Sequence, residues 1–444
     1  MVRTGCQRPG PGALVLCTAI ALAPSPVRPA EEVPAEPRLP ARLGLDEALR
    51  IFRERGLDLL IAEAAVQGAE GDVRAAGAVP NPLASFGVGK SYRCAPGACQ
   101  DLAYTAGLSD QAALENTLSG KRGLRLDAAR AALAVARASR TDAERMLGFQ
   151  VKQQFLASLI GRRALDYARE AQAATREMFN LAQVRFQAGA VSEADVARVE
   201  VLKLEAEQGV EAAVQAATQA KLGLAFLLGV RSSPPEFEAE GPELLKAATP
   251  PTLQGATPES LLALARKSRP DLQAAGYQKE RATAALALAK RLRFPDIALS
   301  LQYAQQGAGE SAVTPPTYTL GLSLPLPLFY QQQGEVAKAE ADRRTQWLQE
   351  ARLEAQVAAD VGNAHASFTA AQRMVERMET RLLDRARLAR DLVQIQYRKG
   401  AASLLDYLDA ERTYIAVQVE YLADLTAYWT ALFQLEQAVG ASLR

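Results

Sequence analysis

One stretch of this chain occurs twice in nearly the same form. Each copy places a glycine, a serine, an aspartate and a glutamate at identical spacing: Gly189, Ser192, Asp195 and Glu200 in the first copy, and Gly400, Ser403, Asp406 and Glu411 in the second. Upstream of each copy lies a pair of short segments with alternating apolar residues. A repeat this long indicates a tandem duplication of one helix–strand–strand–helix–turn–helix unit, and this duplication sets the architecture.

Long tracts without proline predict long helices in both repeats. Proline is absent from residues 97–233 and 328–444, where Ala, Leu, Glu, Gln, Arg and Lys dominate. These residue types favour helix. A helix over residues 120–189 would extend for about 100 Å at 1.5 Å per residue. The chain is therefore expected to be mainly α-helical.

The duplicated motif predicts the turn that follows each long helix. A glycine can adopt the left-handed conformation that ends a helix, and a serine can cap the helix that follows. An aspartate three residues after the serine stands where a capping-box acid is found. Each repeat should therefore contain a helical hairpin whose tip is built from these residues: Gly189, Ser192 and Asp195, and Gly400, Ser403 and Asp406.

Four segments change from the helical period to a period of two. The alternation is clear over residues 297–303 and 318–328, and weaker over 86–92 and 102–108. Each segment has about the length that a tilted membrane strand needs. One set of side chains is apolar and the other is small or polar, which is typical of a barrel with lipid outside and water inside.

Four strands are too few to close a barrel. A sheet with open edges is not tolerated in lipid, and about eight strands are the usual minimum for closure. Two copies of the chain would give eight strands and three copies would give twelve. We favour three, because a twelve-stranded barrel can leave an open channel. Two soluble strand hairpins packed on a helical bundle would also show this alternation.

The bulk composition argues against several functions. The 444 residues carry a net charge of +1, which argues against a nucleic-acid partner. One histidine, His365, and four cysteines leave little for a metal site or a nucleophile. We therefore expect no cofactor, no metal site and no enzymatic activity.

Residues 1–30 are typical of an export signal. Arg3 and Arg8 precede an apolar run over residues 13–23, and prolines end it. The run is too short to span a bilayer as a helix. Leu16 argues against lipid attachment at the neighbouring Cys17. A disordered terminus is the alternative.

Removal of this signal leaves two cysteines, Cys94 and Cys99, on either side of a turn-like Ala-Pro-Gly-Ala segment. In an exported protein such a pair most simply forms a disulfide. A metal site would need further ligands close by in the sequence, and there are none.

The repeat divides the chain into eight parts, which follow in sequence order. They are the signal peptide (1–30), the N-terminal helical segment of repeat 1 (31–81), a strand hairpin (82–112), a helical hairpin (113–232), a Pro-rich linker (233–257), the helical segment of repeat 2 (258–294), a second strand hairpin (295–329) and a second helical hairpin (330–444).

Three stretches resemble the TolC family of outer-membrane efflux proteins. They read RFQAGAVSEADV from Arg185, QYRKGAASLLDYLDAER from Gln396, and LSLPLPLFYQQQGEVAKAEA from Leu322. The last is similar to the branch that serves heavy-metal (cobalt-zinc-cadmium or copper-silver) RND efflux pumps. The resemblance covers nearly the whole mature chain, roughly residues 43–441.

The resemblance implies a homotrimer in which twelve strands form a β-barrel in the outer membrane and twelve long helices form a tunnel across the periplasm. The hairpin tips would contact a periplasmic adaptor protein, which joins the channel to an inner-membrane pump of the RND or another type. The channel would be a passive exit duct. Cys94 and Cys99 would lie in the extracellular loop of the first strand hairpin.

The resemblance also implies a periplasmic gate made of acidic residues. Alignment on Gly400 places the gate at Asp406 and Asp409, which share a helix face because they are three residues apart. A trimer would then hold six carboxylates around one opening, which would attract cations. The alternative is that Asp406 is only a capping acid. In the first repeat Arg198 replaces the second acid.

Two other functions remain open on the sequence. A channel of a type I protein-secretion system would have much the same layout. A periplasmic coiled-coil scaffold without a pore would belong to a different class, and it would be released from membranes by carbonate.

Overall fold

The computed structural model describes residues 34–90, 102–232, 236–306 and 314–443. The described chain divides into two compact units. The strand unit contains Asp72–Ala129 and Ala282–Asp342, and the helical unit contains Ala35–Gly71, Arg130–Arg281 and Arg343–Arg444. Each unit takes segments from both repeats, so neither repeat folds as a separate domain.

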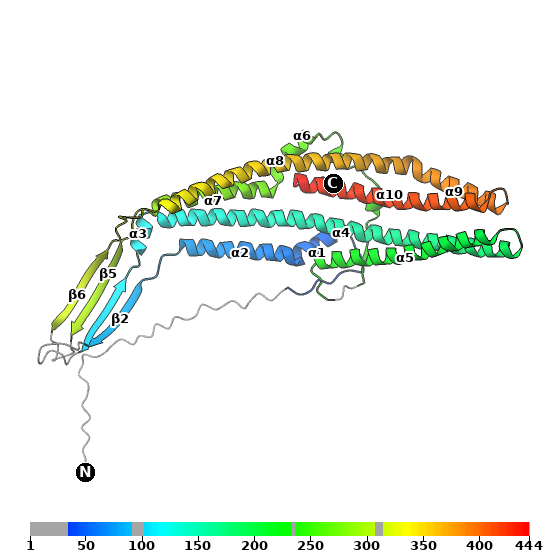
Figure 1. The fold of residues 1–444 in the computed structure, drawn as a ribbon. Helices are drawn as coiled ribbons and strands as arrows, with labels where there is room; N and C mark the ends of the chain where they lie inside the picture. Colours follow the sequence, from blue (N-terminus) through cyan, green and yellow to red (C-terminus); the bar gives the residue numbers. More distant parts are fainter. Residues whose placement is uncertain (1–33, 91–101, 233–235, 307–313, 444) are drawn as a thin grey trace, which may run out of the picture. The chain divides into compact units, whose positions relative to one another are not determined.

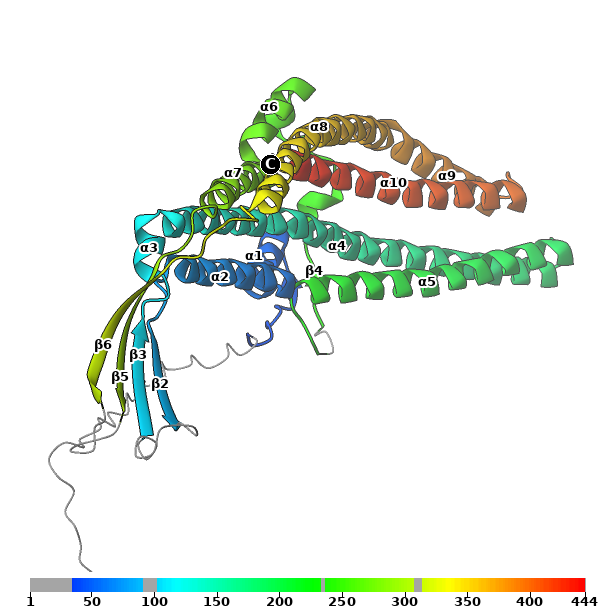
Figure 2. The ribbon, with the colours of Figure 1, turned by 60° about the vertical axis from the view of Figure 1, so that its left-hand side comes forward.

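The strand unit is built on one antiparallel sheet, in which the four strands lie side by side in the order β2-β3-β5-β6 (Figure 2). The strands are β2 (Leu83–Lys90), β3 (Leu102–Ser109), β5 (Ala298–Gln306) and β6 (Thr314–Ser323). The middle pair joins the repeats, because β3 belongs to the first and β5 to the second. Within the described residues, β2 and β6 each pair on one side only, so both edges of the sheet are open.

The strand register separates the side chains of the sheet into two kinds. Two cross-strand rows are apolar or aromatic: Ala84, Leu108, Leu301 and Leu320, and then Phe86, Ala106, Tyr303 and Tyr318. The rows that alternate with them are small or polar: Ser85, Gly107, Gln302 and Thr319, and then Gly87, Thr105, Ala304 and Thr317. Since successive residues of a strand point to opposite faces, one face is apolar and the other is polar.

The apolar face of the sheet is left uncovered by the part of the chain that the structure describes. Phe86 is 86% exposed and Leu320 is 78% exposed. Large exposed apolar surfaces of this kind mark contacts with protein or membrane.

The last strand ends earlier than the alternation predicts. The sequence pattern extends to Leu328, whereas β6 begins at Thr314 and ends at Ser323. Pro325 and Pro327 explain the early end, because proline has no N–H to donate to a neighbouring strand. The residues that follow stay outside the ladder, and Phe329 is 96% exposed.

The strand unit is fixed to its helices by a buried lysine. Lys121 is only 1% exposed and stands at the start of α4 (Lys121–Gln187). Its Nζ donates to the Phe294 carbonyl oxygen and to Asp296 Oδ1, both at 2.6 Å. The bonds hold the start of the first long helix beside the segment that enters β5. A short helix, α3 (Ala113–Leu118), precedes it.

Two helical hairpins dominate the helical unit. The first is made by α4 and α5 (Glu193–Leu227), which run side by side to a common tip (Figure 1). The second is made by the long helix α8 (Gln333–Arg377) with its continuation α9 (Leu383–Arg398), and by α10 (Leu404–Val439). Among the described residues, no helix combines the length and the apolarity that crossing a membrane requires.

Shorter elements fill the space around the hairpins. They are the helices α1 (Leu45–Arg55), α2 (Leu57–Gly77), α6 (Pro258–Ser268) and α7 (Pro270–Arg291), the two-residue parallel strands β1 (Arg42–Leu43) and β4 (Glu238–Ala239), and the 3-10 turns Pro242–Leu245 and Pro251–Leu253.

The long helix of the second hairpin is interrupted, whereas α4 of the first hairpin is continuous. A π-helical turn, Met378–Leu382, separates α8 from α9. Its Glu379 Oε1 accepts hydrogen bonds from the Ala247 backbone N–H at 3.1 Å and from the Tyr421 hydroxyl at 2.9 Å. Such turns bend helices. Here the turn is held by the segment that links the repeats.

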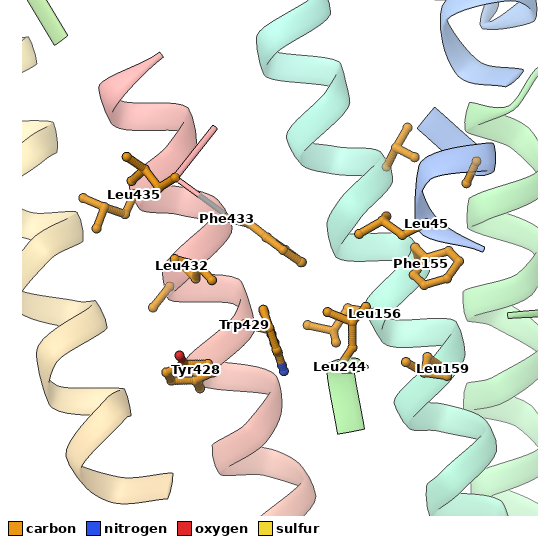
Figure 3. Close-up of a cluster of buried hydrophobic side chains, with 14 of the residues drawn as sticks. Leu45, Phe155, Leu156, Leu159, Leu244, Tyr428, Trp429, Leu432, Phe433 and Leu435 are labelled. Carbon is orange, nitrogen blue, oxygen red and sulfur yellow. The ribbon is translucent and has the colours of Figure 1, made fainter. Parts of the chain in front are cut away.

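One apolar core joins the two repeats inside the helical unit. Phe155 and Leu156 of α4 and Trp429 and Phe433 of α10 belong to the same buried cluster (Figure 3). Each fully buried side chain of this size contributes about 1.5–3 kcal/mol to stability. The two repeats therefore share one hydrophobic core in the helical unit.

Candidate functional site

The two hairpin tips have the same backbone geometry. Gly189 has φ +73° and Gly400 has φ +75°, in the left-handed region that side chains disfavour. The Ala190 N–H donates to the Arg185 carbonyl oxygen at 2.8 Å, and the equivalent bond of the second tip has the same length. This pattern is the Schellman motif. Both glycines therefore act as helix terminators, as the sequence predicts.

Capping boxes begin the helices that follow. In the first tip the Asp195 N–H donates to Ser192 Oγ at 3.2 Å, and Asp195 Oδ2 accepts from the Ser192 backbone N–H at 3.1 Å. In the second tip the Asp406 N–H donates to Ser403 Oγ at 3.2 Å, and Asp406 Oδ2 accepts from the Ser403 backbone N–H at 3.0 Å. Hydrogen bonds from the serines lower the pKa of both aspartates, so both are charged at neutral pH.

The two tips differ in charge. In the first tip Arg198 lies 3.7 Å from Asp195 and offsets its charge. In the second tip Asp409 takes the place of that arginine, and both Asp406 and Asp409 are exposed. Within the described chain, neither carboxylate has a cationic group within 4 Å. The second tip therefore presents two negative charges on adjacent turns of α10, one of which also caps the helix.

A small buried cluster joins the two hairpins just behind the tips. It contains Met178, Ala182 and Val199 from the first hairpin and Tyr397, Leu404, Tyr407 and Leu408 from the second. Beside it, the Arg185 guanidinium lies 4.2 Å from the centre of the Tyr397 ring, and Nη2 donates to the Tyr397 carbonyl oxygen at 3.3 Å. The two tips are therefore in contact within one chain.

The contact between Arg185 and Tyr397 is not part of the sequence-based prediction. Each lies within one turn of a tip glycine, but the contact between them links the two repeats, and a long-range contact of this kind leaves no local sequence signal. Cys94 and Cys99, the predicted disulfide pair, lie outside the described residues. Among the described residues, no group of three or more His, Cys, Asp or Glu side chains could hold a metal ion.

Ser403→Ala should weaken the second tip alone. Loss of a serine N-cap costs about 1 kcal/mol, so amides in the first turn of α10 should exchange with deuterium roughly fivefold faster. Ser192→Ala is the matched control, and it should do the same to the first turn of α5. Equal acceleration at both tips in either variant would contradict independent capping.

The same layout of strands, helical hairpins and duplicated tips is to be compared with known proteins. The model of the outer membrane efflux protein family matches residues 48–230 and 261–441, which is most of the chain. The chain belongs to this family. This efflux protein is therefore an outer-membrane channel of the kind found in tripartite efflux pumps, with its helical part in the periplasm.

Two relatives and one solved structure illustrate the similarity. The cobalt-zinc-cadmium resistance protein CzcC of Cupriavidus metallidurans is 24% identical over 92% of this efflux protein and 93% of its own length. The pyoverdine export outer membrane protein OpmQ of Pseudomonas putida is 25% identical, over 89% of this chain and 85% of its own. The crystal structure of CusC has a TM-score of 0.74 at 18% identity, over 95% of this chain and 99% of its own, and shows the shared fold.

These findings confirm the predicted family, fold class, location and general function. Members of the family are channels, and as parts of tripartite pumps they work as trimers with an adaptor and an inner-membrane transporter. The poreless scaffold is thereby excluded for this efflux protein.

Proposed function

We propose that three copies of this chain form one exit channel, in which β2 of each copy pairs with β6 of the next. Both edge strands are open within the described residues, and unpaired backbone groups are not tolerated in lipid. Residues 82–112 and 295–329 would lie in the outer membrane, and residues 113–232 and 330–444 in the periplasm. The polar face of the sheet would line the channel.

The proposed cargo is a divalent transition-metal cation. The observation that carries this proposal is the uncompensated pair Asp406 and Asp409 at the second tip. In a trimer the pair would supply six carboxylates around the periplasmic entrance, and such a ring concentrates cations. The resemblance to a cobalt-zinc-cadmium resistance protein supports the same cargo.

The two tips are the proposed contact with the periplasmic adaptor. Gly189 and Gly400 are exposed, and each is followed by a serine that orders the next helix. Ser192, Asp195 and Ser403 would belong to the same contact surface. An inner-membrane pump, of the RND or another type, would supply the energy, as in the tripartite pumps to which members of this family belong.

Deletion of this gene should make cells several-fold more sensitive to Zn²⁺, Co²⁺ and Cd²⁺, and the wild-type gene should restore tolerance. The measurement is the minimal inhibitory concentration of each metal, with cationic dyes and detergents measured in parallel. Unchanged metal tolerance in a strain without other channels of this family would contradict the proposed cargo.

Export of a small organic compound is the second candidate, because the similarity to a pyoverdine export protein favours it. For this candidate, cells without the gene should lose tolerance to dyes or retain an organic product that the wild type exports. Their tolerance to metals should not change. If the channel instead serves protein secretion, deletion of the gene should leave tolerance to metals and to dyes unchanged and should abolish the export of a protein.

A further inference from the structure

A cavity of about 780 Å³ lies between the two hairpins of the helical unit. It is lined by α4 and α5 of the first hairpin and by residues of the second, including Glu411 and Tyr414 of α10. Small residues such as Ala171 and Ala206 form much of its wall. The volume is in the range of sites that hold a small organic molecule.

One charged side chain of the cavity wall is buried without a partner. Glu411 is only 5% exposed. Within the described chain, its carboxylate has no hydrogen bond and no ion pair within 4 Å. Burial raises the pKa of this carboxyl group, while Arg390 partly opposes that shift. A buried carboxylate without partners is unfavourable, so it favours a ligand that brings a cation or a donor.

The cations around the cavity are already engaged. The Arg390 Nε lies 2.8 Å from Asp391 Oδ1, and the Arg390 guanidinium lies 4.3 Å from the centre of the Tyr414 ring. The Arg412 guanidinium, which also lines the cavity, lies 3.6 Å from the Glu205 carboxylate. Glu411 is therefore a buried charge of this wall that has no hydrogen bond and no ion pair within 4 Å among the described residues, and Arg390 offsets it only in part.

We propose that this cavity binds an apolar organic cation, with a positively charged nitrogen group on Glu411 and its apolar body against the alanine-rich wall. A metal ion fits the site poorly, because divalent cations need several oxygen, nitrogen or sulfur ligands, and of the described glutamates that line the cavity only Glu411 is buried. The site is separate from the acidic pair at the tip, so it stands independently of the proposed metal cargo.

The duplication supplies a matched control for this site. Glu200 holds the position of Glu411 in the first repeat, but it is exposed. A glutamine at either position keeps the size of the side chain and removes its charge. Glu411→Gln is expected to fold, because it replaces a buried charge by a neutral group.

The test uses the full-length protein in lipid nanodiscs and the cationic dye rhodamine 6G, with binding followed by fluorescence anisotropy. We expect saturable binding that Glu411→Gln weakens about tenfold or more, since a charge-assisted contact is lost. Ala206→Phe should weaken binding similarly by filling the cavity. Glu200→Gln should bind like the wild type, and the anionic dye fluorescein should not bind.

Three results would overturn the proposal. They are no saturable binding of rhodamine 6G, equal affinity of the wild type and Glu411→Gln, and equal losses in the Glu411→Gln and Glu200→Gln variants. The last would mean that the dye responds to surface charge. Occupation of the cavity by a side chain of a neighbouring copy would give the first result, and would contradict a small-molecule site.

Discussion

Leu320→Arg should abolish the membrane-embedded assembly of this protein. Leu320 lies in an apolar cross-strand row with Leu301 and Leu108, and it is 78% exposed on the face that we expect to contact lipid. An arginine facing lipid near the bilayer midplane costs about 2–4 kcal/mol. Three copies in one barrel would cost roughly 6–12 kcal/mol, which is comparable to the whole stability of a typical folded protein.

Thr319→Arg is the control, because Thr319 is the next residue on the same strand and lies on the polar face. It should leave assembly intact and change only the charge of the channel interior. The measurement is the fraction of protein that remains in the membrane pellet after carbonate extraction, together with the amount of trimer on unheated gels. Retention of the Leu320→Arg trimer, or loss of both variants, would contradict the assignment of the two faces.

Asp406→Asn combined with Asp409→Asn should open the periplasmic entrance. The double variant removes two negative charges from each chain and so six from a trimer, and asparagine at position 406 can still accept the capping hydrogen bonds. Cations held by the acidic ring obstruct the narrow entrance, and the ring holds them less tightly once these charges are lost. We therefore expect a higher single-channel conductance in planar bilayers and a weaker preference for cations.

Asp195→Asn is the matched control, since that aspartate has the same capping role but lies 3.7 Å from Arg198. It should leave both conductance and cation preference unchanged. If the double variant shows the conductance and selectivity of the wild type, the acidic pair does not form the gate, and Asp406 is only a capping residue.

The features that were predictable from the sequence are local ones. Gly189, Ser192 and Asp195 form their turn and capping box with near neighbours in the chain, so their types and spacing predict both. The strands were predictable from alternation, but the end of β6 was not, because apolar alternation continues past Ser323 through two prolines that have no N–H to donate to a ladder.

Features that depend on contacts between the repeats were not predictable. Glu200 and Glu411 hold equivalent positions in the sequence, yet the first is exposed and the second is 5% exposed. The difference arises from the packing of neighbouring helices around α10, which a local pattern does not encode. The contact between Arg185 and Tyr397 escaped prediction for the same reason.

The two open edges of the sheet have a consequence for biogenesis. Within the described residues, β2 and β6 of a single copy each leave one side unpaired, so in the proposed assembly the sheet is complete only when copies meet, and its stability would depend on their concentration. In the proposed trimer, folding and association would be one reaction that requires three molecules to meet. A modest fall in synthesis would then reduce the number of assembled trimers more than proportionally. Unassembled monomers would be substrates for periplasmic chaperones and proteases.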